Sequence, residues 1–200
     1  MTTATLSHNK VAAPALPGWL VLLLAALLAG FGLSCLAGGA QSALPGVPTL
    51  ERSVKAAYLS KFLGYVDFAE PAPNAPLHVG VLAADDIAAE LTRITAGRPV
   101  NGRPVLVRRL RDGDALDGLE MVFIGADATR PVQALRNAAE KSVLSVTEMD
   151  NGLQQGAVIN FRLVDNRVRF EVSLPAAEKS GLRLSSRLLS VAYHIQKDKP

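Results

Sequence analysis

The alternation of apolar runs and helical patterns between residues 77 and 146 constrains the fold more than any other feature of this sequence. Short apolar runs of the kind that suit buried strands occupy residues 77–82, 105–107, 120–124 and 143–146. One helical pattern runs from residue 85 to near Gly97, and a second, with Pro131 in its first turn, runs through Ala139. This alternation predicts an α/β fold whose parallel strands are joined by right-handed crossovers.

The chain after residue 156 has the pattern of an antiparallel hairpin. Residues 157–164 and 167–174 are both strand-like, and the two-residue link Asp165-Asn166 tolerates positive φ. Because a two-residue link fixes the register, the facing residues can be counted outward from it. One face is apolar and the other polar; the predicted pairs are Leu163 with Val168, Phe161 with Phe170, Ile159 with Val172, Arg162 with Arg169, and Asn160 with Glu171.

Three more helices complete the predicted fold. Residues 49–65 place apolar side chains at helical spacing and predict an amphipathic first helix. Residues 175–180 and 186–196 predict two closing helices. The expected architecture is α/β: a mixed, mostly parallel sheet flanked by helices, with a C-terminal antiparallel hairpin and closing helices.

The first fifth of the chain has the composition of an export signal. Lys10 is the only charged side chain before Gln41, residues 19–29 are unbroken apolar, and small residues dominate positions 30–40. This order predicts a secretory signal peptide over residues 1–40, with an uncleaved membrane anchor as the alternative. The remaining chain is then a linker over residues 41–48 and a single domain over residues 49–197.

Charge and cysteine content narrow the class further. The formal net charge is +3, and basic residues are interleaved with acidic ones, so nucleic acid is not an expected partner. Cys35 is the only cysteine, and its loss with the leader would leave the exported domain without a thiol. Lipidation of Cys35 is disfavoured because Gly32 stands where a lipobox has a large aliphatic residue.

The sequence offers no established motif for cofactor binding or catalysis. It has no G-x-G-x-x-G motif, no phosphate-binding Gly-Lys motif and no G-x-S-x-G motif. Outside the leader, only His78 and His194 remain as histidines, which are too few and too far apart for a zinc site. Ser185 is interpreted as a helix cap. We therefore expect no cofactor, no metal, no catalytic residue and no enzymatic activity.

An acidic cluster resembles a phosphoacceptor site at first sight. Asp85 and Asp86 follow the first predicted strand, and Asp127 follows the third. Because the first two stand at a helix start, where carboxylates accept from free amide groups, the capping interpretation is preferred.

Two groups of arginines are candidates for binding an acidic partner. The first group is Arg98, Arg103, Arg108, Arg109 and Arg111, and we expect the acids that follow, Asp112, Asp114 and Asp117, to neutralise it. The second group is the facing pair Arg162 and Arg169, which is unfavourable unless a negative charge offsets it. Glu171, diagonal to Arg162, is one such charge; an acidic helix or a partner protein is the other possibility.

Separated blocks of the chain carry a resemblance to a known family. They read VKAAYL at 54–59, VNGRPV at 100–105, VFIG at 122–125, GAVINF at 156–161, RVRFEV at 167–172 and GLRLSSRLL at 181–189. The chain resembles the YfiR-like family of periplasmic proteins over about residues 50–193. It departs from the family at residues 68–71, at Lys61 and in lacking cysteines after the leader.

The resemblance implies a non-enzymatic periplasmic regulator of α/β fold. The family's namesake binds the periplasmic sensory domain of a membrane-bound diguanylate cyclase and inhibits it, which lowers cyclic di-GMP, a promoter of biofilm. The implied partners are that cyclase, an outer-membrane lipoprotein that sequesters the repressor, and a second copy of the chain. Such a regulator must bind the inactive cyclase more tightly than the active one.

The predicted partner-binding residues lie on the polar side of the hairpin and on the helix after it. They are Asn160, Arg169, Glu171, Arg183 and Arg187. A structural alternative pairs Arg183 and Arg187 with Glu171 or Glu178. A functional alternative is a periplasmic small-ligand sensor, associated with a signalling or outer-membrane receptor system, whose pocket lies at the carboxyl edge of the sheet near Gly125 and Ala126.

Overall fold

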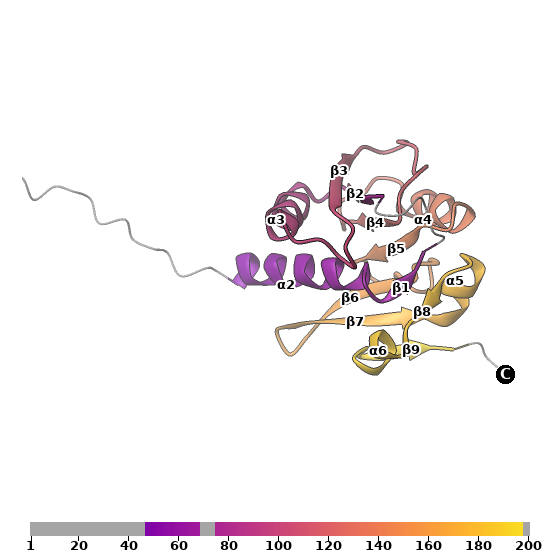
Figure 1. Ribbon diagram of the computed structural model, residues 1–200. Helices are drawn as coiled ribbons and strands as arrows, with labels where there is room; N and C mark the ends of the chain where they lie inside the picture. The colour runs from indigo at the N-terminus through magenta and orange to yellow at the C-terminus, as the bar shows by residue number, and fades with distance from the viewer. Residues whose placement is uncertain (1–46, 69–74, 198–200) are drawn as a thin grey trace, which may run out of the picture. The chain divides into compact units, whose positions relative to one another are not determined.

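The structure, a computed structural model, describes residues 47–68 and 75–197 (Figure 1). The predicted leader, Cys35 and most of the predicted linker lie outside the described residues. Among the residues that are described, no helix combines the length and the apolar composition needed to cross a bilayer.

A seven-stranded mixed sheet forms the centre of the fold, in the order β3-β2-β4-β5-β6-β7-β9. Its strands are β2 (Leu77–Leu82), β3 (Val105–Leu110), β4 (Met121–Ile124), β5 (Leu144–Thr147), β6 (Ile159–Val164), β7 (Arg167–Ser173) and β9 (His194–Gln196). All neighbouring pairs are parallel except β6 and β7, which are antiparallel. The predicted α/β class and the mostly parallel sheet are confirmed.

Helices cover both faces of this sheet, and the burial pattern of β4 explains how. The helices are α2 (Val47–Phe62), α3 (Asp85–Thr95), α4 (Pro131–Glu140), α5 (Leu174–Lys179) and α6 (Ser186–Ser190). All four β4 residues are buried, Met121 and Phe123 in one apolar cluster and Val122 and Ile124 in another. Successive side chains of a strand point to opposite faces, so the sheet separates two cores. The larger core contains residues of α2 and α3, and the smaller one residues of α4.

The hairpin has the register that the sequence predicts. Leu163 faces Val168, Phe161 faces Phe170, and Arg162 faces Arg169. Asp165 and Asn166 adopt φ values of 49° and 56°, the left-handed conformation that the two-residue turn requires.

The apolar face of the hairpin packs against α2 through aromatic rings. Tyr58 lies 5.4 Å from Phe170 between ring centroids, and Phe62 lies 5.9 Å from Phe161. Figure 1 shows the β6–β7 turn at the same end of the domain as the start of α2.

The predicted closing helix over residues 186–196 is wrong in its second half. The helix α6 ends at Ser190, and residues 194–196 form β9, which pairs in parallel with β7. Without β9, β7 would be an open edge strand with unpaired backbone groups. The Tyr193 amide donates to the Phe170 carbonyl at 2.8 Å, and the β-branched and aromatic residues nearby suit a strand.

Two smaller differences from the prediction concern the end of the first helix and a second, short sheet. The first helix stops at Phe62 rather than Tyr65, and Val66–Asp67 forms the short strand β1. This strand pairs antiparallel with β8 (Arg183–Leu184), a second sheet that no sequence pattern indicated. Two-residue strands carry too little periodicity to be recognised from sequence.

Candidate functional site

A chain of buried hydrogen bonds underlies the polar face of the hairpin. Asn160 is fully buried, accepts from the Thr147 hydroxyl at 2.6 Å, and donates from Nδ2 to Glu171 Oε1 at 3.1 Å. A Cβ atom on Gly152 would lie 2.5 Å from Asn160 Oδ1, so only glycine fits there. Asn160 therefore acts inside the fold, where it orients the Glu171 carboxylate.

The two facing arginines of the hairpin differ in their surroundings. Arg162 Nη1 lies 3.7 Å from Glu171 Oε1, so the predicted diagonal partner is present. Glu171 exposes 14% of its side chain and Arg162 exposes 48%. Arg169 is exposed, and no carboxylate among the described residues lies within 4.0 Å of it. The polar face thus presents one compensated and one uncompensated guanidinium.

The structure places the five predicted interface residues on different surfaces. Asn160, Glu171 and Arg169 share the polar face of the hairpin. Arg187 of α6 borders a hollow with Phe170, whose side chain points to the opposite face from that of Glu171. Arg183 belongs to β8 and faces Asp67 in the second sheet. Neither Arg183 nor Arg187 forms an ion pair with Glu171 or Glu178 within the described part of the chain.

An apolar groove runs along α2 beside the hairpin, and the sequence did not predict it. We call it the α2–β7 groove, and it consists of two hollows of about 310 and 240 Å³ that share Tyr58. The first is lined by Leu50, Glu51, Val54, Tyr58, Leu163, Asn166, Arg167, Val168 and Arg169. The second is lined by Tyr58, Lys61, Phe62, Tyr65, Phe170, Arg187, Leu188 and Val191. The spacing of Leu50, Val54 and Tyr58 marks this stripe in the sequence, but which of its residues stay exposed depends on how α2 packs.

A charged cluster lies on α2 at the carboxyl edge of the sheet. Lys55 Nζ lies 2.5 Å from both Glu51 Oε1 and Glu148 Oε2, and Glu148 also accepts weakly from the Ala126 amide at 3.4 Å. Burial alone would lower the pKa of Lys55, but its hydrogen bonds to Glu148 and Glu51 outweigh burial and raise the pKa. The ammonium therefore stays charged and joins α2 to the loop after β5.

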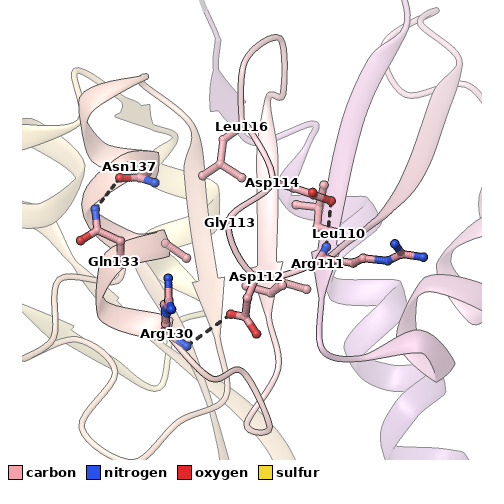
Figure 2. A pocket seen from close by; sticks show the side chains of 11 residues that line it. Leu110, Arg111, Asp112, Gly113, Asp114, Leu116, Arg130, Gln133 and Asn137 are labelled. Carbon is pink, nitrogen blue, oxygen red and sulfur yellow. Dashed lines mark hydrogen bonds between the residues drawn. The ribbon is translucent and has the colours of Figure 1, made fainter.

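The carboxyl edge near Gly125 offers little room for a ligand. A Cβ atom on Gly125 would lie 2.3 Å from the Ala83 carbonyl oxygen, so the two loops touch there. Figure 2 shows the cavity that lies farther along this edge, between the loop after β3 and α4. Its volume is about 60 Å³, enough for a few water molecules and far below that of a typical ligand pocket.

Several polar groups that line this cavity are already hydrogen-bonded within the protein. The Arg130 amide donates to Asp112 at 3.3 Å, and Gln133 donates to Asn137 at 2.8 Å (Figure 2). Asp114 accepts from the Arg111 amide at 2.9 Å.

The first arginine group is dispersed and partly neutralised, though not by the acids that follow it. Arg103 pairs with Glu120 at 2.7 Å, and Arg109 lies 3.6 Å from Asp85. Asp117 instead pairs with Lys141.

The acidic cluster is also divided among local partners. Asp85 and Asp86 lie in the first turn of α3, but the residue at the N-cap is Ala84 and no side chain caps the helix; Asp86 accepts only from the adjacent Ile87 amide, at 2.8 Å. Ser185 caps α6 by accepting from the Leu188 amide. Within residues 47–68 and 75–197, no three potential metal-ligating side chains come together.

Comparison with known proteins identifies a family, and solved structures also match the chain. The sequence model of the YfiR/HmsC-like family matches residues 52–193. The crystal structure of a conserved domain protein from Vibrio cholerae O1 biovar El Tor str. N16961 superposes with a TM-score of 0.49 at 11% identity. That match covers 72% of this chain and 60% of the Vibrio chain. No curated protein matches the sequence.

Proposed function

The chain belongs to the YfiR/HmsC-like family, and from this membership we propose that it is a periplasmic regulator of a membrane-bound diguanylate cyclase. It binds the periplasmic sensory domain of the cyclase and inhibits the enzyme, which lowers cyclic di-GMP. The observation that carries the proposal is the family match over residues 52–193. In this role the protein makes and breaks no covalent bond.

Inhibition by binding requires a difference in affinity between two states of the cyclase. To shift an enzyme from almost fully active to almost fully inactive, the regulator must bind the inactive state about 10⁴-fold more tightly. Interfaces gain such discrimination from charge complementarity and from the removal of water around anchoring side chains. The uncompensated Arg169 and the Glu171 carboxylate, held in place by Asn160, supply fixed charges of both signs.

Export and assembly form part of the same proposal. Residues 1–40 direct the chain across the inner membrane and are removed, and residues 41–48 connect the cleavage point to the domain over residues 49–197. An outer-membrane lipoprotein competes with the cyclase for the regulator, and two copies of the regulator associate.

Removal of the protein tests the proposal. Cells that lack the chain should contain more cyclic di-GMP than wild-type cells, and the full-length gene should restore the lower level. Crosslinking in membranes should recover the regulator together with a diguanylate cyclase. Unchanged cyclic di-GMP, or restoration by a chain confined to the cytoplasm, would contradict the proposal.

A further inference from the structure

The α2–β7 groove exposes apolar side chains to an unusual degree. Leu50 exposes 61% of its surface, Leu163 55% and Val191 62%, and these are three of the six large hydrophobic residues that are exposed in the described chain. Tyr58 lies at the centre and borders both hollows. Contiguous exposed apolar surface of this kind marks a binding site more often than isolated exposed residues do.

The rim of the groove is cationic. Lys61, Arg167, Arg169 and Arg187 border the two hollows, all four are exposed, and none forms an ion pair within the described residues. The one acidic residue on the lining, Glu51, is engaged by Lys55. A partner that fits this rim must therefore carry negative charge.

We propose that the α2–β7 groove binds an acidic amphipathic segment of the regulated protein. Apolar side chains of that segment contact Tyr58 and the exposed leucines, and its carboxylates pair with the four rim cations. The helical part of the stripe, from Leu50 to Phe62, spans about 18 Å at the rise of an α-helix, which matches a partner helix of about three turns. The inference rests on the proposed function and specifies the chemistry of the partner.

Other occupants fit the groove less well. A second copy related by a twofold axis would bring the cationic rim against itself, which is repulsive. Residues 1–46 contain no Asp or Glu, so the chain's own N-terminal segment cannot neutralise the rim. A bilayer surface is flat, whereas the two hollows of about 310 and 240 Å³ are concave.

Site-specific photocrosslinking of the full chain in its own cells tests the inference. A benzoylphenylalanine probe replaces Leu163 in one variant and Val191 in another, and matched control variants carry it at Leu106 or Val132, which are exposed apolar positions outside the groove lining. Both groove probes should crosslink to one segment of a membrane signalling protein that combines Asp or Glu with apolar residues. Mass spectrometry of the crosslinked peptide identifies that segment.

Charge variants then test the rim. Arg169→Glu combined with Arg187→Glu should lower the groove crosslinks about tenfold, whereas Arg98→Glu, an exposed residue away from the groove, should leave them unchanged. The neutral pair Arg169→Gln and Arg187→Gln should give a smaller loss. Thermal midpoints close to that of the wild type confirm that the variants fold.

The outcomes separate this inference from the proposed function. Crosslinks to lipid, to a second copy, to residues 1–46 or to a segment without acids overturn the inference, as does a yield no higher than that of the control positions. If removing the protein leaves cyclic di-GMP unchanged, the proposed function fails whatever the groove binds. If cyclic di-GMP responds but groove and control probes behave alike, the groove inference alone fails.

Discussion

At the scale of single residues, the polar core of the hairpin depends on Asn160. This amide is fully buried and satisfies two other polar groups, the Thr147 hydroxyl and the Glu171 carboxylate. A buried polar group that loses its partner is costly because no water replaces the lost bond. Asn160 thus connects the Glu171 carboxylate on the polar face of the hairpin to the Thr147 hydroxyl inside the sheet.

Replacing Asn160 should destabilise the domain more than its small volume suggests. We expect Asn160→Ala to lower the free energy of unfolding by about 1–3 kcal/mol, since it leaves the Thr147 hydroxyl and Glu171 without their partner. Urea unfolding followed by circular dichroism measures the change. The exposed Gln154→Ala serves as the control, and an equal effect of the two substitutions would show that the buried network contributes little.

At the scale of elements, a hydrogen bond between side chains links α2 to α3 beside their apolar contact. The Ser53 hydroxyl of α2 donates to Glu90 of α3 at 2.7 Å, and Arg93, one turn farther along α3, donates to the same carboxylate at 2.8 Å. The hydrogen bonds from Arg93 and then from Ser53 lower the pKa of Glu90 to about 2, against a usual value of 4.5.

This depressed pKa predicts a pH dependence of stability. Because the folded state holds Glu90 ionised, the stabilisation is complete above pH 4.5 and is lost as pH falls through about 2. Glu90→Gln should therefore have a lower thermal midpoint than the wild type at pH 6, with a difference that shrinks by pH 2. A difference that stays constant from pH 6 to pH 2 would contradict this role. Arg93 is exposed, so salt should also reduce the difference.

The sequence predicts elements well where local chemistry decides them. The Asp165-Asn166 turn fixes the hairpin register, and the apolar run at Leu77–Leu82 is a strand with those bounds. Prediction from the sequence fails for β9, whose residues could continue a helix but pair instead with the open edge of β7. That edge exists only after distant parts of the chain have assembled.

The interface prediction shows the same limit. Strand alternation correctly placed Arg169 and Glu171 on one face of the hairpin. It could not show that Asn160 is buried beneath Gly152, or that Arg187 borders the opposite face, because both depend on packing between elements.

At the scale of the whole molecule, two surfaces on opposite faces of one hairpin are available for partners. The polar face carries Arg162, Arg169 and Glu171, and the α2–β7 groove lies on the other side of the same two strands, with Arg169 reaching its rim. Arg169 borders both surfaces, so separate tests use residues that belong to one surface only, such as Glu171 for the polar face and Arg187 for the groove.

Charge reversal on the polar face should disturb regulation. We expect Glu171→Lys to raise cyclic di-GMP to the level of cells without the protein, since it places a third positive charge beside Arg162 and Arg169. The thermal midpoint should fall by a few degrees because the bond from Asn160 is lost. Glu171→Gln keeps an acceptor for Asn160 and isolates the effect of charge, and Glu178→Lys on α5 is the exposed control. If the Glu171→Lys variant regulates fully at normal abundance, this face is not part of the interface.

The position of β9 at the outer edge of the sheet has a consequence for the order of folding. The outermost strand, residues 194–196, pairs with β7, and α5, β8 and α6 lie between these two strands in the sequence. Contacts between parallel strands far apart in sequence form slowly, because a long loop must close before each one is made. The β6–β7 hairpin, whose strands are joined by two residues, is therefore expected to form before β9 adds to its free edge.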